Sequence, residues 1–130
     1  MKKEVEILIS QICQEDPRYP ADAYGFLLEA LSFTQKKFRR QKHVTGKELL
    51  EGIKILLMEK FGPMTLLVLK HWGIDKTDDF GNIVFNLVNK KLLSKTEEDD
   101  IAHFRDVYDF EDVFREGYRR RLSKEISRIR

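Results

Sequence analysis

The sequence predicts a mainly α-helical protein: one compact domain of about six helices that covers residues 1–130. Apolar residues recur at intervals of three and four along most of the chain, which is the spacing of one helix face. Proline and glycine occur where these stripes end, and one segment carries a complete helix-capping pattern. A chain of this length buries roughly two-thirds of its unfolded surface, so we expect a core that is stable without disulfides or metals.

The composition indicates a protein of a reducing compartment. The only cysteine, Cys13, excludes an internal disulfide framework and a multi-cysteine zinc site. Glu4 and Glu6 interrupt the basic start of the chain and no cleavage site follows, so a signal peptide is not predicted. The longest apolar run, 64–69, is too short to span a membrane. We expect a cytoplasmic protein without a membrane partner. The 35% of charged residues is typical of heat-adapted proteins and also of ordinary charged helical surfaces.

The first two helices are separated by prolines. The first is predicted over residues 3–14, and the segment 15–20 ends it because its two prolines do not fit inside a helix. The second is predicted over 21–40 and ends in the basic stretch 36–42.

The third helix has the clearest start. Thr45 and Glu48 have the spacing of a capping box, in which each side chain bonds the backbone N–H of the other residue. Val44 and Leu49 occupy the positions of a hydrophobic staple, and the apolar pattern continues to Phe61.

Two further helices follow. Gly62 suits the end of the third helix and Pro63 the start of a short one, which we expect to end by Trp72. Thr77 is predicted to be the N-cap of a helix that reaches Asn89.

Two structures are open for the segment after residue 91. Ser94 and Glu97 have the spacing to cap a helix that extends to about Arg105. Alternatively, residues 92–93 pair with 107–108 as a small hairpin at 92–108, which would make the three preceding helices winged-helix-like.

A basic helix is predicted over 110–130, beginning near Asp109. It either docks on the body of the domain or crosses to a second copy and forms a homodimer. Its apolar stripe consists of Phe110, Phe114, Tyr118, Leu122, Ile126 and Ile129.

Charge is sorted along the chain. Residues 35–60 hold eight Lys/Arg and three Glu, residues 75–112 five Lys/Arg and eleven Asp/Glu, and residues 113–130 seven and two. The blocks either neutralise each other in the fold or bind partners. For an anionic partner, the candidate patch is Lys36, Lys37, Arg39, Arg40, Lys42, Arg119, Arg120 and Arg121.

Nucleic acid is the alternative partner. In a winged-helix arrangement the 78–89 helix would read the major groove, but its outward side chains would be two aspartates and three asparagines. DNA binding depends on neutralising phosphates, so this acidic surface opposes it and basic blocks 36–42 and 115–130 are the better candidates. The side chains expected to point outward are Asp78, Asp79, Asn82, Asn86 and Asn89.

No catalytic or cofactor motif is present, so we expect neither an enzyme nor a bound cofactor. The one metal-like set is Asp99, His103 and Asp106, which share one side if that segment is helical. Metal sites usually need more imidazole or thiolate, so an exposed polar face is the better explanation of this set.

Several strings resemble a family of small bacterial proteins for which no activity is established. The matching segments are FGPM at 61–64, WGI at 72–74, DFGNIVFNLV at 79–88, LLSKTEED at 92–99 and VYDF at 107–110. The resemblance implies no catalytic residues. Apolar faces on nearly every helix and the lack of catalytic motifs favour a module for protein–protein interaction or self-association.

Overall fold

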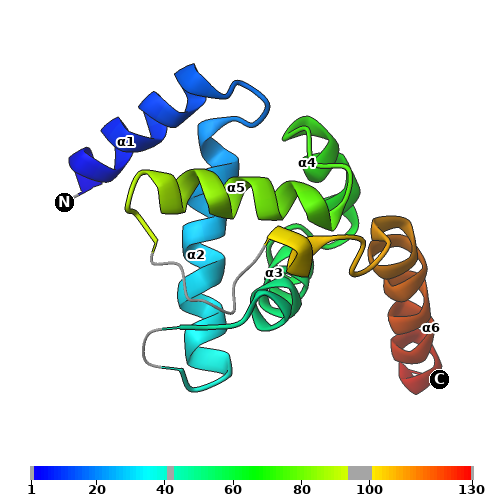
Figure 1. Cartoon of the computed structure of the whole chain (residues 1–130). Helices are drawn as coiled ribbons and strands as arrows, with labels where there is room; N and C mark the ends of the chain where they lie inside the picture. Colours follow the sequence, from blue (N-terminus) through cyan, green and yellow to red (C-terminus); the bar gives the residue numbers. More distant parts are fainter. Residues whose placement is uncertain (1, 41–42, 94–100, 130) are drawn as a thin grey trace.

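The computed structural model describes residues 2–40, 43–93 and 101–129, and this part of the chain is mainly helical and contains no strand (Figure 1). The predicted all-α class is confirmed. Helix α4 has only seven residues, so the described chain has five long helices, each of 13 residues or more, rather than about six. The α-helices are α1 (Lys2–Glu15), α2 (Ala21–Lys37), α3 (Gly46–Phe61), α4 (Thr65–His71), α5 (Thr77–Asn89) and α6 (Gly117–Ile129). The shorter elements are the 3-10 turns η1 (Gly62–Met64) and η2 (Ile101–Phe104) and the π-helical segment η3 (Glu111–Glu116).

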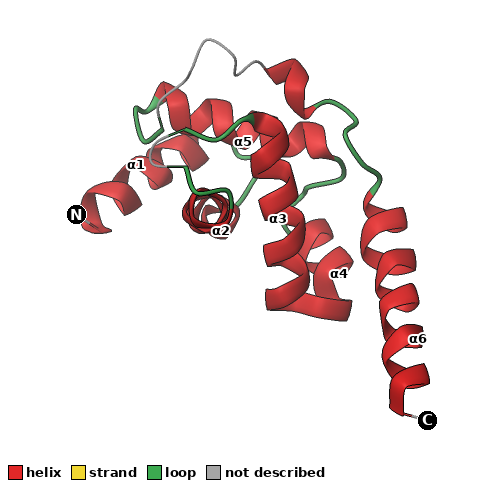
Figure 2. Cartoon of the chain, turned by 90° about the horizontal axis from the view of Figure 1, so that it is seen from below, coloured by secondary structure: helices red, strands yellow, loops and turns green. Residues whose placement is uncertain are grey.

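Helix α2 is central. It packs against α3, and α5 crosses it on one side, with α1 against both α2 and α5 (Figure 1). Helix α4 packs on α3, and α6 stands at the edge of the molecule beside α4 (Figure 2). None of the helices among the described residues is long and apolar enough to span a membrane.

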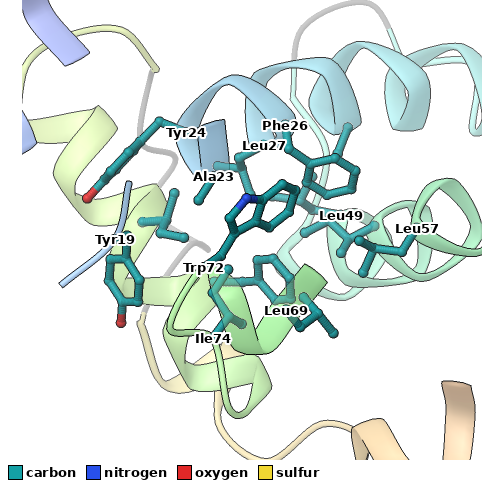
Figure 3. Packing of buried hydrophobic residues seen from close by; sticks show 14 of the residues in the cluster. Tyr19, Ala23, Tyr24, Phe26, Leu27, Leu49, Leu57, Leu69, Trp72 and Ile74 are labelled. Atoms are coloured by element: carbon teal, nitrogen blue, oxygen red, sulfur yellow. The ribbon is translucent and has the colours of Figure 1, made fainter. Parts of the chain in front are cut away.

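The core forms where α2, α3 and α5 meet. Its fully buried side chains come from all three helices, and burial of each contributes roughly 1.5–3 kcal/mol. Trp72, at the end of α4, extends this core between the helices (Figure 3). Its ring lies 5.4 Å from that of Phe26 and 5.8 Å from that of Phe61, measured between centroids.

The start of α3 is as predicted. The Thr45 backbone N–H donates to Glu48 Oε1 at 2.9 Å, and the Glu48 N–H donates to Thr45 Oγ1 at 3.1 Å. Arg40 also donates to the Glu48 carboxylate, at 3.0 Å. These bonds lower the pKa of Glu48 below its usual value. At the other end, Gly62 has a φ of +49°, which a residue with a side chain rarely adopts.

The predicted start of α5 is wrong. Thr77 does not cap the helix, because its Oγ1 donates to the Phe104 carbonyl at 2.6 Å and accepts the Val107 N–H at 3.0 Å. The Asp79 carboxylate accepts the N–H groups of Asp75 and Lys76 instead. The hydroxyl of Thr77 therefore holds the chain around η2 against α5.

The hairpin at 92–108 is not formed in the described part of this segment, since neither 92–93 nor 107–108 is a strand. Tyr108 packs against the core instead, where its hydroxyl donates to the Leu50 carbonyl at 2.7 Å. The alternative helix from Ser94 to Arg105 falls largely on residues 94–100, outside the described residues, and its last turn is the 3-10 turn η2. Helix α2 also ends earlier than predicted, at Lys37, and Arg39 takes a left-handed φ of +56°.

Candidate interaction surface

The apolar stripe of the C-terminal helix divides into a docked half and an exposed half. Phe110 and Phe114 are buried, whereas Leu122 is 43% exposed and Ile126 49%. Tyr118 lies at the boundary and is half-buried. Every side chain from residue 119 to 128 is exposed, and Figure 2 shows α6 reaching past α4 to the edge of the molecule. The helix therefore docks only by its first turns.

An aromatic cluster holds this docked half. The Phe110 ring lies 5.7 Å from Phe114 and 6.1 Å from both Phe80 and Tyr108, measured between centroids. Such pairs each add about 0.5–1.5 kcal/mol beyond the area that they bury. Because η3 continues directly into α6, this anchored segment sets the direction in which α6 projects.

Helix α4 exposes apolar side chains beside α6. Thr65 and Leu69 are four residues apart and face the core, so the helix turns Leu67 outward, where it is 60% exposed. Met64, in η1, is 52% exposed. A groove of about 710 Å³ runs between α4 and the start of the C-terminal helix, and its lining includes both side chains and Tyr118. Leu122 lies one turn beyond Tyr118. We call these exposed side chains and the groove the C-terminal surface: Met64, Leu67, Tyr118, Leu122 and Ile126.

A second apolar depression, of about 840 Å³, lies on the other side of α4. Its lining includes Phe61, Leu67 and Trp72, with Lys60 and His71 among its polar side chains. Leu67 thus stands on a ridge between two apolar hollows. Exposed patches of this kind on a small domain usually mark contact with another molecule.

The structure does not bring the two basic blocks together. Figures 1 and 2 both place α3 between the end of α2 and α6. In the first block, Lys36, Lys37 and Arg39 are exposed, Arg40 binds Glu48, and Lys42 lies outside the described residues. The seven described residues of the predicted patch therefore lie in two separate places.

Most of the described cations on α6 form no ion pair. Arg119 pairs with Glu116 at 3.4 Å, one turn back, and Arg115 of η3 pairs with Glu111. Within the described residues, no ion pair is formed by four of its exposed basic side chains, which are Arg120, Arg121, Lys124 and Arg128. The helix is thus amphipathic and strongly basic.

Most of the face of α5 expected to point outward is covered instead, and of its five residues only Asn89 is exposed. Asp79 accepts a hydrogen bond from the Tyr19 hydroxyl, and Asn82 donates to that hydroxyl at 3.0 Å. Asn86 donates to Asp16 and to the Tyr24 hydroxyl, both at 2.9 Å. The connection between α1 and α2 therefore occupies the surface that a recognition helix would need. In the sequence only Tyr19, beside Pro20, and Tyr24, one turn into α2, hinted at this contact.

The electrostatics of this network are those of a structural contact. Hydrogen bonds from Arg18 hold the pKa of Asp16 well below its usual range, and the Asn86 bond adds to the effect. Burial and the bond to Asp79 raise the pKa of Tyr19 to about 12. Both groups keep one protonation state at neutral pH.

The candidate metal ligands are only partly described. Asp99 lies outside the described residues, while His103 in η2 and Asp106 just after it are exposed. Asp106 donates its backbone N–H to Asp78 at 2.8 Å. In the described ranges, no three His, Cys, Asp or Glu side chains gather as a metal ion requires. Cys13 is half-buried, and burial raises the pKa of its thiol, so the reactive thiolate is disfavoured.

Comparison with protein-family models, with curated proteins and with solved structures found no match to this chain.

Proposed function

We propose that this chain is a non-enzymatic helical module that binds another protein, or a second copy of itself, through the C-terminal surface. The observation that carries this proposal is the exposure of Leu122 and Ile126 on a helix whose preceding turns are firmly docked. A partner that covers these apolar side chains would stabilise the complex by roughly 25 cal/mol for every Å² of apolar surface buried. A cytoplasmic location and a bacterial, heat-adapted source are further proposals, supported by the composition and the family resemblance.

Site-specific photo-crosslinking in cells tests this function. A photoreactive amino acid at Leu122 should form adducts with a defined protein, identified by mass spectrometry. The matched control carries it at Ser32, an exposed position of α2 and not part of the C-terminal surface.

A charge on the apolar stripe should abolish the adduct. Ile126→Arg leaves the fold intact because the side chain is exposed, which circular dichroism checks. The function is wrong if positions 122 and 32 capture the same proteins, or if position 122 captures none. It is also wrong if Ile126→Arg leaves the adduct unchanged.

The alternative function is nucleic-acid binding through the basic blocks 36–42 and 115–130. Four cations of α6 that form no ion pair within the described residues favour it, and phosphate contacts would dominate because most of the polar face of α5 is covered. Binding would be lost steeply with added salt. Replacing Arg119, Arg120 and Arg121 with Ala should weaken a mobility shift at low salt, and the lack of any shift for the unmodified protein would exclude the alternative.

A further inference from the structure

A cleft lies between α1 and the end of α4, over the first turns of α2, and no residue of the C-terminal surface lines it. Figures 1 and 2 both show α1 and α4 on opposite sides of α2. We infer that this cleft binds a small zwitterion that carries an aromatic ring, of the class of the aromatic amino acids. The inference goes beyond the proposed function and does not depend on it.

The cleft has the size and the lining of a small-molecule site. Its volume is about 1090 Å³, close to the upper end of ligand pockets, which span roughly 300–1,000 Å³. Ile9, Phe26 and Trp72 line it and are buried, so only a small part of each side chain reaches the cleft. Pro17 and Pro20 add exposed apolar surface. Such a lining suits an aromatic ring.

Gly25 lines the cleft at a helical position where the fold itself does not require glycine. An added methyl group would have no atom within 4 Å, and the glycines with a positive φ are Gly62 and Gly73. Glycine inside a helix lowers stability relative to alanine, so neither packing nor conformation explains it here. Glycine also allows a ligand to approach the backbone closely. Gly25 therefore leaves room for a flat ring to lie directly on α2.

Charges of both signs lie around Trp72. Asp22, Lys70 and His71 line both the cleft and the second apolar depression, so they stand where the two hollows adjoin. All three are exposed, and none forms an ion pair within the described residues. A zwitterion places its ammonium group beside Asp22 and its carboxylate beside Lys70. An uncharged ligand would remove water from these groups without replacing its hydrogen bonds, which costs free energy.

The whole lining of the cleft is balanced in charge. Its two other charged residues are Arg18, whose guanidinium binds Asp16, and Glu6 on α1. Two carboxylates thus stand against the cations Arg18 and Lys70. This balance disfavours a ligand of large net charge, such as a nucleotide, and favours one that carries both signs.

Titration of the purified chain with L-phenylalanine, followed by NMR, tests the inference. The amide signals of Gly25 and Gly73 and the indole N–H signal of Trp72, the only tryptophan, should shift and saturate in the millimolar range. Gly52 and Gly117 do not line the cleft, so their amide signals should stay unchanged.

Three relatives of this probe separate its parts. L-alanine lacks the ring, phenethylamine lacks the carboxylate, and phenylpropanoate lacks the ammonium group. L-alanine should not bind. Each of the other two should bind about three- to fivefold more weakly than L-phenylalanine, which is the effect of one exposed ion pair.

Two variants assign the charges. Asp22→Asn should weaken the binding of L-phenylalanine by a similar factor but leave that of phenylpropanoate unchanged, because phenylpropanoate has no ammonium group. Lys70→Gln should weaken the binding of L-phenylalanine but leave that of phenethylamine unchanged. Lys47→Gln, at an exposed position of α3 outside the cleft, is the matched control and should change neither.

Gly25→Leu tests the space above α2. Leucine is a better helix former than glycine, so the variant should stay folded, which circular dichroism checks, while the binding of L-phenylalanine is lost. Ser32→Leu, at an exposed position of α2 outside the cleft, is the control and should bind normally.

The inference is overturned if L-phenylalanine does not shift the signals of the cleft, or if folded Gly25→Leu still binds it. It is also overturned if phenethylamine and phenylpropanoate bind as tightly as L-phenylalanine, since the charges would then play no part. None of these results affects crosslinking at position 122, so the inference and the proposed function fail separately.

Discussion

At the scale of single residues, Gly52 allows α2 and α3 to approach closely. A methyl group at Gly52 would lie 1.8 Å from Thr34 Oγ1, and Thr34 is fully buried with its hydroxyl donating to the Ala30 carbonyl. Thr34 therefore has no room to move aside. We expect Gly52→Ala to lower the free energy of unfolding by about 2–3 kcal/mol, although alanine is the better helix former. Urea unfolding followed by circular dichroism measures the change.

Gly25 provides the matched control, because it lies on the exposed side of α2 with no atom within 4 Å of an added methyl group. Gly25→Ala should raise the free energy of unfolding by about 0.5–1 kcal/mol. Thr34→Ala removes the hydroxyl with which the methyl group of Gly52→Ala would clash. The double variant should therefore lose less stability than the sum of the losses of the two single variants. Equal stability of Gly52→Ala and the unmodified chain would contradict the close approach.

Single residues were predictable from the sequence where their partners are close in the chain. Thr45 and Glu48 bond each other three residues apart, so their pattern alone predicted the contact. The hydroxyl of Thr77 instead binds Phe104, 27 residues away, and Asn86 binds Tyr24, 62 residues away. A sequence pattern does not reveal such partners, because they meet only when the helices pack.

At the scale of elements, the start of α3 depends on its capping box. Thr45→Ala removes the acceptor of the Glu48 N–H and should lower the free energy of unfolding by about 1 kcal/mol. Ser32→Ala, at an exposed position inside α2, is the control and should not destabilise the fold. Urea midpoints compare the variants, and an unchanged midpoint for Thr45→Ala would show that the box does not stabilise α3.

The helices themselves were largely predictable, because most of them bury an apolar stripe, and α1, α3 and α4 end beside a glycine or proline. The same stripe does not say how far along its length a helix is docked. The apolar positions of the last helix keep one spacing throughout, yet the structure buries Phe114 and exposes Leu122. The sequence therefore allowed an interaction surface on the last helix as one alternative. It did not show where along the helix that surface begins.

At the scale of the whole molecule, the fold keeps the two basic blocks apart but mixes the charges beside α6. The two basic blocks have α3 between them, so neither strengthens the field of the other at close range (Figure 2). The groove beside α6 is lined by residues of both signs: Asp75, Asp109 and Glu111, and Lys70, Arg115 and Arg119. Along this groove the packing of the helices therefore mixes charges that the sequence keeps in separate blocks.

The whole fold should lose stability in alkali because three of its tyrosines must ionise on unfolding. Burial raises the pKa of Tyr19 to about 12 and also raises the pKa values of Tyr24 and Tyr108. An unfolded chain releases these protons near pH 10, whereas the folded chain still holds them. The unfolded state then binds fewer protons, so the free energy of unfolding falls as pH rises above about 10.

Tyr108→Phe tests how much one of these tyrosines contributes to the pH dependence of stability. The variant loses the hydrogen bond to the Leu50 carbonyl, which should lower the free energy of unfolding by about 1 kcal/mol at neutral pH. Above about pH 10 its stability should then fall less steeply than that of the unmodified chain, by up to about 1.4 kcal/mol per pH unit, since one ionisation no longer accompanies unfolding. Urea unfolding at a series of alkaline pH values measures both slopes. Parallel slopes would mean that Tyr108 ionises in the folded protein, and that its hydroxyl is not held in the core by Leu50.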